Sequence, residues 1–396
     1  MLRYLTAGES HGPGLVAILE GMPSQVPVDA ADINVDLTRR MGGYGRGGRM
    51  KIEKDAVRIL GGVRHGRTLG SPISLLIENR DWENWQETMA VDASAPPSAP
   101  GRPPMTRPRP GHADLAGGLK YDHRDLRNVL ERASARETAI RVAVGGVCKC
   151  LLRAFGVRIL GHVVEMGGVR AATEGLSVDE IAEQADASPV RCADPMATRA
   201  IMAKVDEAQA RGTSVGGVFE VLALGVPVGL GTHVHWDLRL DGRLAQALMS
   251  IQAIKGVEIG PAFEVARRFG CDVQDEIYYR TPDEDATGGS GYFRKTNFAG
   301  GLEGGVTTGQ PIVVRAAMKP ISTQYQPLTS VDIVTKEASR AGVERTDITA
   351  VPAAAVVGEA VVAFEIARAL REKCGGDSLA EMRRNFEAYV AYLRTA

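Results

Sequence analysis

The order in which strand-like and helix-like segments follow one another is the feature that most constrains the fold of this chain. Apolar runs typical of strands occur at residues 15–19, 57–60, 74–77, 157–165, 217–228 and 311–318. Apolar residues at helical spacing occur at residues 27–41, 126–155, 195–212, 240–251 and 350–373, and helices are also expected to begin at Ser177 and Ser378. Because these segments lack a strict βαβ alternation, we expect the α+β class, as a sandwich of helices and antiparallel-rich sheets.

These segments are expected to form one large domain over residues 1–396. Three stretches rich in glycine, proline or polar residues, near residues 42–50, 93–111 and 283–296, are predicted to be flexible functional loops. A domain boundary within residues 93–110 is an open alternative. The other is that this long connection wraps over a site, because a basic segment follows at its far end.

Composition and charge exclude several classes of function. The chain is 44 % hydrophobic and 24 % charged, and no apolar run approaches the ~20 residues that span a bilayer. Residues 1–10 lack the pattern of a signal peptide, so a cytoplasmic location is expected. The five cysteines are scattered without zinc or redox spacing, which predicts free thiols and no metal site. The net charge of −1 argues against generic nucleic-acid binding.

Positive charge is nevertheless concentrated in one part of the chain. Nine Lys or Arg residues but only two acids lie between Arg39 and Arg67. Residues 43–48 fit the pattern GxGxxG, but they follow a predicted helix capped by Asp29 or Asp32, whereas a dinucleotide-binding loop follows a strand. We therefore predict an arginine-bearing loop that binds a small polyanion. A solvated surface loop is the alternative.

The stretch from Arg107 to Gly146 has more functional side chains than a fold requires. It opens with a rigid Arg-Pro-Arg-Pro-Gly-His segment that ends at His112. The helical pattern at residues 126–155 places Arg132 and Arg136 four residues apart, on one face of the predicted helix. Since two like charges at this spacing repel each other, a bound anion is the attractive explanation. The sequence thus predicts an anion site with a titratable group beside it.

Two further segments contain candidate functional residues. Ser10 and His11 are adjacent between glycines, and neighbouring residues point in different directions, which disfavours a serine hydrolase. His11 is a candidate acid, base or phosphate contact, with a structural histidine as the alternative. Residues 319–323 close a predicted strand with an amine and two hydroxyls, a suitable phosphate-binding turn. His233 and His235 lack a third metal ligand and are expected to have surface or core roles.

Taken in order, these motifs resemble those of the chorismate synthases. The matching segments are residues 8–12, 42–49, 109–112, 132–137, 257–260, 300–305 and 319–323, together with Arg345 and Asp347. The resemblance runs from Tyr4 to about Leu393 and so covers essentially the whole chain. A single motif of this kind is weak evidence for a family, whereas eight motifs in the same order are specific evidence.

The resemblance implies a lyase of the shikimate pathway, which leads to the aromatic amino acids. This lyase would make chorismate by anti-1,4-elimination of phosphate from 5-enolpyruvylshikimate 3-phosphate. Such enzymes need reduced FMN although the reaction has no net redox change. The two carboxylates and the phosphate of the substrate would explain the arginine-rich loops. The resemblance also implies a homotetramer, and since no reductase domain is visible, reduced FMN would come from an external reductant.

The resemblance also implies roles for individual residues. The catalytic residues would be His11, His112 and Asp347. The FMN contacts would be Arg132, Ala133, Ser134, Gln252, Ala253, Gly304, Lys319, Pro320, Ile321, Ser322, Thr323 and Arg345. Arg40 and Arg46 match positions that bind NADP(H), and they could equally contact the substrate. The other substrate candidates are Ser10, Arg49, Arg107 and Arg136.

Departures from the family pattern are small, and two other classes of function stay open. Ala133 and Gln252 stand where serine and asparagine are common, which could change one hydrogen bond to the flavin. An RNA-binding module could use the Gly/Arg loop, and its binding would depend strongly on salt. An NAD(P)-dependent dehydrogenase could use the GxGxxG match, and it would oxidise NAD(P)H without flavin.

Overall fold

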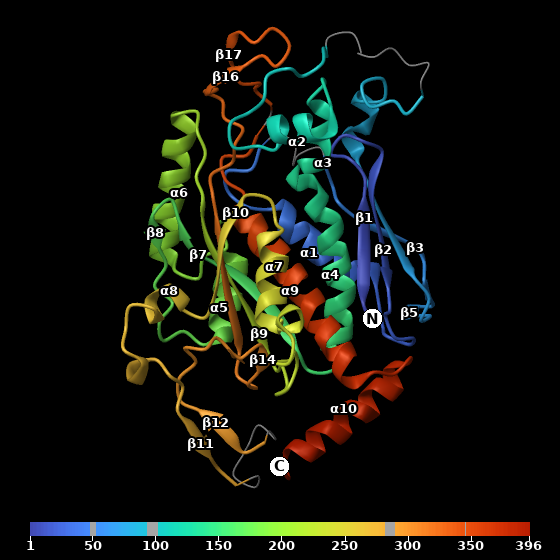
Figure 1. The fold of residues 1–396 in the computed structure, drawn as a ribbon, viewed down its shortest axis with the longest axis vertical. Coiled ribbons are helices and arrows are strands. Elements are labelled where there is room, and N and C mark those ends of the chain that lie inside the picture. The colour runs from blue at the N-terminus through green and yellow to red at the C-terminus, as the bar shows by residue number, and fades with distance from the viewer. Residues whose placement is uncertain (48–52, 93–101, 282–289, 345) are drawn as a thin grey trace.

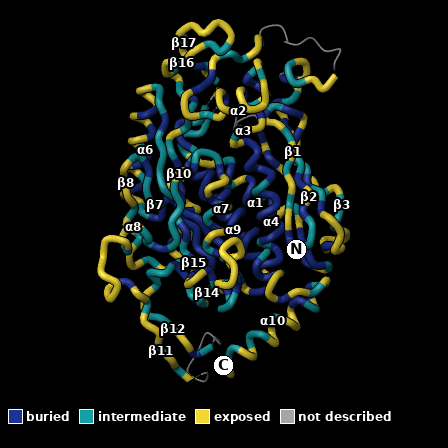
Figure 2. Tube along the Cα trace, in the orientation of Figure 1, coloured by how far each residue is buried: buried dark blue, intermediate teal, exposed yellow. Residues whose placement is uncertain are grey.

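Two antiparallel sheets enclose a layer of helices in the computed structural model, which describes residues 1–47, 53–92, 102–281, 290–344 and 346–396 (Figure 1). Every strand pairing in the two large sheets is antiparallel, and helices α1, α4 and α9 lie between the sheets. The predicted class, a mixture of helices with antiparallel-rich sheets, is therefore confirmed. One hydrophobic core joins both sheets to the helices (Figure 2).

The first sheet has four strands in the order β1-β2-β6-β3. Its strands are β1 (Arg3–Ala7), β2 (Gly14–Glu20), β6 (Ile73–Glu78) and β3 (Val57–Gly61). Apolar residues alternate along β2 and β6, so that Leu15, Leu19 and Leu75 are fully buried on the face toward α4. The predicted strands at residues 15–19, 57–60 and 74–77 are confirmed.

The second sheet has five strands in the order β10-β15-β9-β7-β8. Its strands are β10 (Ile254–Ile259), β15 (Ile312–Met318), β9 (Gly217–Leu224), β7 (Arg158–Met166) and β8 (Val169–Arg170). Helix α9 packs against β7 and β9 on the inner face of this sheet, and α5 packs on β7. The strands expected near residues 157–165, 217–228 and 311–318 are confirmed.

The central layer is built from α1 (Ala30–Met41), α4 (Thr138–Arg153) and α9 (Val351–Cys374). Nearly all of α9 is buried, as expected for a helix whose first six turns are mostly apolar. Gly145 of α4 lies against Ala360, where a Cβ atom would come within 2.4 Å of the Cα. The glycine therefore lets the two backbones approach closely. Asp29 caps α1 by accepting a hydrogen bond from the Ala31 N–H, as predicted.

The other elements lie around these layers. The helices are α2 (Asp114–Tyr121), α3 (Arg127–Ala133), α5 (Val178–Ala187), α6 (Pro195–Ala210), α7 (Leu240–Met249), α8 (Ala262–Val265) and α10 (Leu379–Leu393), with short 3-10 turns at Arg80–Asn84, Ala135–Glu137, Trp236–Leu238 and Gly270–Asp272. The small hairpins are β4 (Val63–Arg64) with β5 (Arg67–Thr68), β11 (Ile277–Tyr279) with β12 (Tyr292–Arg294), β13 (Leu302–Glu303) with β14 (Val306–Thr307), and β16 (Thr329–Val331) with β17 (Ala338–Arg340). Ser177 forms a capping box with Glu180 at the start of α5, where the sequence predicts that a helix begins.

The single helix predicted over residues 126–155 is wrong, because the chain leaves the helix at Ser134. This residue has extended backbone angles, φ −65° and ψ 141°, and its hydroxyl accepts a hydrogen bond from the Arg136 N–H. A serine side chain competes in this way with helical hydrogen bonding. The break separates α3 from α4 and turns Arg136 inward, so that Arg132 and Arg136 do not share one helix face.

Two findings concern the chain as a whole. All five cysteines are free, as predicted; four are buried and Cys271 is exposed. Within the described residues, no helix is both long and apolar enough to cross a membrane, and no group of His, Cys, Asp and Glu is arranged to hold a metal ion.

Candidate active site

The break between α3 and α4 is a point at which distant segments meet. Ser10, in the β1–β2 connection, donates its N–H to the Glu131 carbonyl, and its hydroxyl lies 3.2 Å from that of Ser134. The Arg132 guanidinium donates to the Gly8 carbonyl at 3.0 Å and to Thr6.

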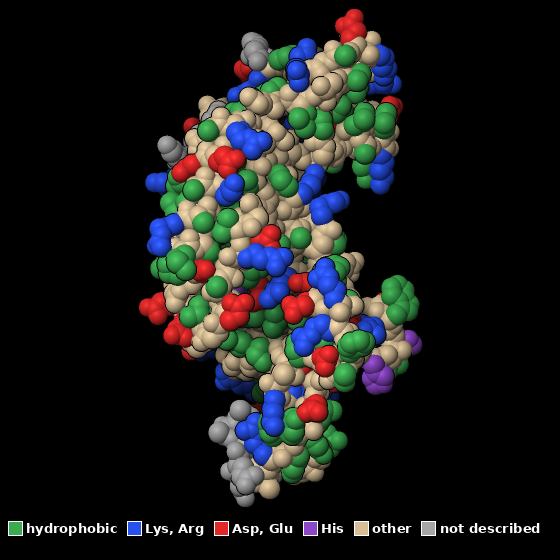
Figure 3. Space-filling view, turned by 90° about the vertical axis from the view of Figure 1, so that its left-hand side faces the viewer, with side chains coloured by type: hydrophobic (Ala, Val, Ile, Leu, Met, Phe, Trp, Pro, Cys, Tyr) green, Lys and Arg blue, Asp and Glu red, His purple; other side chains and the backbone are tan. Residues whose placement is uncertain are grey.

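The outline of the molecule is hollowed on one side, below the end that carries β16 and β17, with Lys and Arg side chains at the rim (Figure 3).

His11 is held by a buried carboxylate from α3. Its Nδ1 atom lies 2.9 Å from both oxygens of Glu131, and its backbone N–H donates to the same group at 2.8 Å. The ring stacks on Trp85 with the centroids 3.8 Å apart. Burial acts to raise the pKa of Glu131, but hydrogen bonding to His11 and the charges of His11 and Arg127 outweigh it and lower the pKa. An ionised Glu131 favours a proton on Nδ1 and directs Nε2 away from the carboxylate.

His112 has a similar arrangement with Asp114. Its Nδ1 atom lies 2.5 Å from the Asp114 carboxylate, which also accepts the Arg109 Nε–H at 2.8 Å. Arg109 Nη2 is 3.0 Å from His112 Nδ1, and the fully buried Asp114 carboxylate contacts both side chains. Burial acts to raise the pKa of Asp114, but the hydrogen bonds from His112 and Arg109 dominate and place it well below its usual range.

The turn at residues 319–323 contacts the segment that carries His112. The Lys319 ammonium and the Ser322 hydroxyl both donate to the Gly111 carbonyl, at 2.5 and 2.8 Å. Thr323 accepts a hydrogen bond from Arg109 at 2.9 Å. The two candidate segments, predicted independently from the sequence, therefore form one polar surface. Pro320 and Ile321 lie between these side chains, and the Ile321 carbonyl accepts the Ser214 hydroxyl.

Gln252 and Ala253 lie beside this turn. The Lys319 N–H donates to the Ala253 carbonyl at 3.0 Å, and Ala253 has a left-handed backbone with φ 67°. Gln252 donates to Glu137 at 3.3 Å. Its Oε1 atom is buried and finds no hydrogen-bond partner among the described residues. A buried acceptor of this kind is suited to a ligand N–H group.

Asp347 pairs with the Gly/Arg loop that follows α1 and starts at Gly42. Its carboxylate lies 2.7 Å from Arg46 Nη1 and accepts the Gly47 N–H at 2.6 Å. The neighbouring Ile348 N–H donates to the Gly45 carbonyl. The loop therefore runs directly beside the segment that precedes α9. The candidates Arg49 and Arg345 lie outside the described residues, as do parts of the three predicted flexible loops.

Two of the candidate arginines are buried in an ion network. Arg136 donates to both oxygens of Asp55, at 2.6 and 2.7 Å, and to Asn79. Arg40 donates to Thr138 and lies 3.5 Å from Asp55. Burial, opposed by Asp55 and assisted by the nearby Arg136 and Arg46, lowers the pKa of Arg40 to about 9. Arg136 also lies 3.5 Å from the buried Glu53, so two carboxylates, Asp55 and Glu53, face the two guanidinium groups.

Two candidates lie apart from this cluster. The Arg107 side chain is 60 % exposed, and its ion pair with Asp332 is long, with Nε 3.9 Å from the carboxylate. Gly304 forms the turn of the β13–β14 hairpin, next to the start of β15, whereas Lys319 follows the end of that strand. The length of β15 therefore separates them by on the order of 20 Å. Within one chain, Gly304 does not join the other candidate residues.

Sequence reasoning did not identify the partners of the two histidines. Asp114 is two residues from His112, and this short spacing was an available signal. Glu131 is 120 residues from His11, and nothing local in the sequence connects them. The stack of Trp85 on His11 depends on the tertiary fold, and no sequence motif connects the two residues.

Comparison with known proteins gives a consistent result. The family model described as chorismate synthase matches residues 2–370. Chorismate synthase from Geobacter metallireducens is 58 % identical over 395 residues, and the match covers 100 % of both chains. The Aquifex aeolicus chorismate synthase is 56 % identical over 402 residues, covering 100 % of this chain and 98 % of the relative. A crystal structure of chorismate synthase superposes with a TM-score of 0.79 at 46 % identity, covering 100 % of this chain and 99 % of the other. This chain belongs to the chorismate synthase family.

Proposed function

We propose that this protein catalyses the anti-1,4-elimination of phosphate from 5-enolpyruvylshikimate 3-phosphate, giving chorismate for aromatic amino acid biosynthesis. The observation that carries the proposal is the pair of histidine–carboxylate contacts in a family member. His11 with Glu131 and His112 with Asp114 supply two proton-handling groups. Arginines, a lysine and hydroxyls on neighbouring segments supply the cationic surroundings that a substrate with three anionic groups needs.

The residues around the 319–323 turn fit FMN. Lys319, Ser322 and Thr323 offer a cation and two hydroxyls for a phosphate, and the buried Gln252 Oε1 offers an acceptor for a flavin N–H. Arg132, Ala133, Ser134 and Ala253 would line the same site, and Arg345 is an additional candidate. When bound in reduced form, FMN would supply electron density as the allylic phosphate leaves.

His11 would act on the departing phosphate. Glu131 holds its Nδ1 atom, so Nε2 is the atom that would donate a proton to a phosphate oxygen. The Trp85 stack fixes the plane of the ring and excludes water from one face. Ser10 and Ser134, whose hydroxyls are 3.2 Å apart, would orient the substrate beside it.

His112 would work at the flavin side of the site, because its segment contacts the 319–323 turn. Asp114 orients the ring and stabilises its protonated form, which would hold positive charge next to an electron-rich ligand. The Arg109 guanidinium fixes Asp114 in turn. These contacts position His112 before any ligand arrives.

Asp347 would accept the ring hydrogen as a proton. The Arg46 guanidinium and the Gly47 N–H hold its carboxylate in place beside the Gly/Arg loop. Substrate anions would compete for Arg46 and so free one carboxylate oxygen for proton transfer. Arg46 would thereby couple substrate binding to the base.

The substrate anions would be held by Arg40, Arg46, Arg49, Arg107 and Arg136. Asp55 holds Arg40 and Arg136 in position, and these guanidinium groups would attract a carboxylate or the phosphate of the substrate. NADP(H) is a second candidate ligand for Arg40 and Arg46. We also expect that an external reductant supplies the reduced FMN.

We also propose a cytoplasmic homotetramer with no nucleic-acid or membrane partner. An assembly would cover Ile277, Tyr279 and Tyr292 on the β11–β12 hairpin, which are 62 %, 56 % and 53 % exposed. It could also bring Gly304 of one copy toward a flavin held by another. Light scattering should give four times the chain mass of 42.2 kDa, and a stable monomer at micromolar concentration would contradict the assembly.

The direct test is an anaerobic assay with 5-enolpyruvylshikimate 3-phosphate and chemically reduced FMN. Chorismate should form only when both are present. A protein that oxidises NAD(P)H without flavin would instead support a dehydrogenase. Salt-sensitive RNA binding without chorismate formation would support a nucleic-acid-binding protein.

A further inference from the structure

We infer that Glu359, in the middle of α9, is a positioning residue that fixes Arg40 and the Gly42–Gly47 loop against Asp347. Glu359 lies outside the candidate site, and its side chain is fully buried. The inference rests on the proposed function of Arg40, Arg46 and Asp347. It extends that proposal by identifying what holds these three residues in one arrangement.

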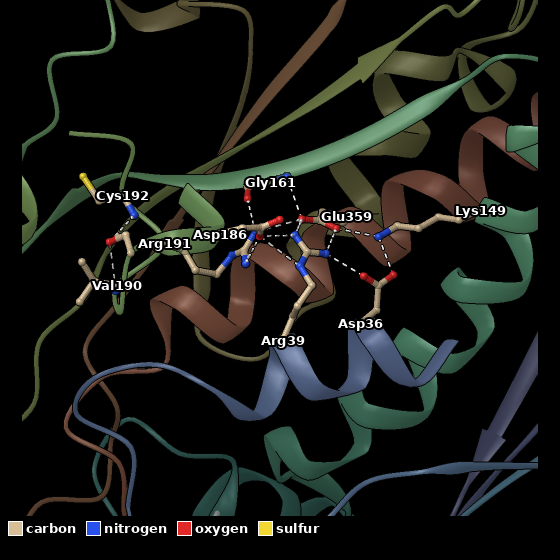
Figure 4. Close-up of polar contacts among 10 residues, drawn as sticks. Asp36, Arg39, Lys149, Gly161, Asp186, Val190, Arg191, Cys192 and Glu359 are labelled. Carbon is tan, nitrogen blue, oxygen red and sulfur yellow. Dashed lines mark hydrogen bonds and ion pairs between the residues drawn. The ribbon is translucent and has the colours of Figure 1, made fainter. Parts of the chain in front are cut away.

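Glu359 is the centre of a buried ion network (Figure 4). Its two oxygens accept a bidentate pair of hydrogen bonds from Arg39, both 2.8 Å long. Lys149 donates at 2.6 Å, and the Gly161 N–H of β7 donates at 2.8 Å. Arg191 reaches the carboxylate at 3.5 Å. One side chain of α9 therefore holds α1, α4, the second sheet and the segment before α6.

The network is electrically balanced. Its cations are Arg39, Lys149 and Arg191, and its anions are Asp36, Asp186 and Glu359. Burial acts to raise the pKa of Glu359, but Lys149 and Arg39 outweigh it and lower the pKa to about 2. The carboxylate is thus charged throughout the physiological range. Its loss would leave a buried excess of positive charge.

The first connection to the active site runs through α1. Arg39 and Arg40 are consecutive residues of its last turn, so their side chains point about 100° apart. Arg39 is fixed by Glu359, while Arg40 donates to Thr138 and the Ala135 carbonyl in the site. Rotation of α1 about its axis would therefore move Arg40 away from these partners. The helix ends at Met41, and the Gly42–Gly47 loop starts from this fixed end.

The second connection runs through residues 186–192. Arg191 binds both Asp186 and the Gly161 carbonyl at 2.8 Å, although its backbone is in the left-handed region with φ 56°. Within the same segment, the Pro189 carbonyl accepts the Tyr44 N–H at 2.7 Å. The Gly42–Gly47 loop is thus held both at its start and at Tyr44 by segments that contact Glu359.

The third connection is α9 itself. Asp347 lies four residues before the start of this helix, and Glu359 lies just over two turns into it. The partners of Asp347 are Arg46 and Gly47, at the end of the same loop. Through Glu359, α9 therefore fixes both the loop that carries Arg46 and the segment that carries Asp347.

A purely structural role would affect stability alone, so the test separates stability from position. Glu359→Gln keeps the shape but leaves three cations facing two carboxylates. Adding Lys149→Met removes one cation and restores the charge balance, without restoring the ionic fork to Arg39. Glu372→Gln is the matched control, because it breaks an ion pair from the same helix to the buried Arg243 at 2.7 Å, away from α1.

Steady-state kinetics with reduced FMN should show KM for the substrate raised at least about 10-fold in Glu359→Gln, as expected when binding groups are displaced. In the charge-balanced double variant, thermal stability should recover toward that of wild type while KM stays raised. Glu372→Gln should lose stability with KM unchanged. Recovery of KM together with stability in the double variant would overturn the positioning role.

Hydrogen exchange gives a readout that does not depend on activity. Amides of residues 42–47 and 186–192 should exchange faster in Glu359→Gln than in wild type or Glu372→Gln. Unchanged exchange in these segments would overturn the inference. If the wild-type protein made no chorismate, the proposed function would fail, while faster exchange would still support the anchoring of the loop by Glu359.

Discussion

Replacement of Glu131 by glutamine should slow turnover strongly while leaving the fold intact. Glutamine keeps the size of the side chain and one oxygen that can accept the His11 N–H. It removes the charge that stabilises a protonated His11 and favours the proton on Nδ1. Because the Glu131 carboxylate contacts Nδ1 of His11 and leaves Nε2 for the substrate, its effect on turnover should come through His11.

The magnitude follows from the contacts. Glu131 is 1 % exposed, and its oxygens lie 2.9 Å from His11 Nδ1, so the hydrogen bond is charge-assisted and poorly screened. A hydrogen bond to a charged group contributes about 1.5–3 kcal/mol. If that energy is realised in the transition state, the rate constant falls about 10-fold to 150-fold. The loss should be smaller than that caused by removing His11 itself.

Single-turnover experiments with prereduced FMN would measure the effect on chemistry. The control is Glu220→Gln, which alters another buried histidine–carboxylate contact, 3.1 Å from His162 in the second sheet. That variant should lose stability but keep its rate constant. A Glu131→Gln enzyme with a wild-type rate constant, or one slowed no more than the control, would refute the role of Glu131.

Acid stability provides an independent check on the same contact. The pKa of Glu131 is lowered in the folded protein, because His11 and Arg127 outweigh the effect of burial. Its contribution to stability is therefore complete above the ordinary value of 4.5 and is lost as the pH falls through the lowered pKa. The difference in unfolding free energy between wild type and Glu131→Gln should therefore shrink as the pH falls below 4.5. A difference that grew on acidification would contradict this sign.

Three further predictions concern the site. Asp347→Asn should still bind FMN and substrate while turnover falls at least about 10²-fold, and unchanged single-turnover rates would return Asp347 to a loop-fixing role. His11→Ala and His112→Ala should each lose roughly 10²-fold to 10⁴-fold in turnover with normal circular dichroism, and near wild-type turnover would make that residue structural. Oxidised FMN should bind more tightly when substrate is present, because both ligands would share one pocket; equal affinities by titration would argue for separate sites.

Much of the fold could be predicted because it depends on local patterns. Apolar periodicity located β2, β6, β15 and α9, and side-chain caps located the starts of α1 and α5. The break at Ser134 was missed because the apolar spacing continues across it. The hydroxyl of Ser134 and the ionic partners of Arg136 determine the break, and those partners are Asp55 and Glu53, more than eighty residues earlier in the chain. Short elements such as β1 and α2 carry too little periodicity to be detected.

The residue types and motifs of the candidate site could be predicted from the sequence. The side chains that contact the candidate residues could not. The proximity of the 109–112 segment to the 319–323 turn follows from long-range packing, although both were recognised separately. The carboxylates of Glu131 and Asp114 sit within helical segments, where acidic residues are common and carry no special signal. The ion network of Glu359 joins segments more than three hundred residues apart.

The most direct test of the account follows the flavin and both products in one anaerobic cuvette. Reduced FMN, 5-enolpyruvylshikimate 3-phosphate and the protein should give phosphate and chorismate in equal amounts, over many turnovers for each flavin. The flavin should be recovered in its reduced form. Product formation limited to one equivalent per flavin, with oxidised flavin at the end, would contradict an elimination without net redox change.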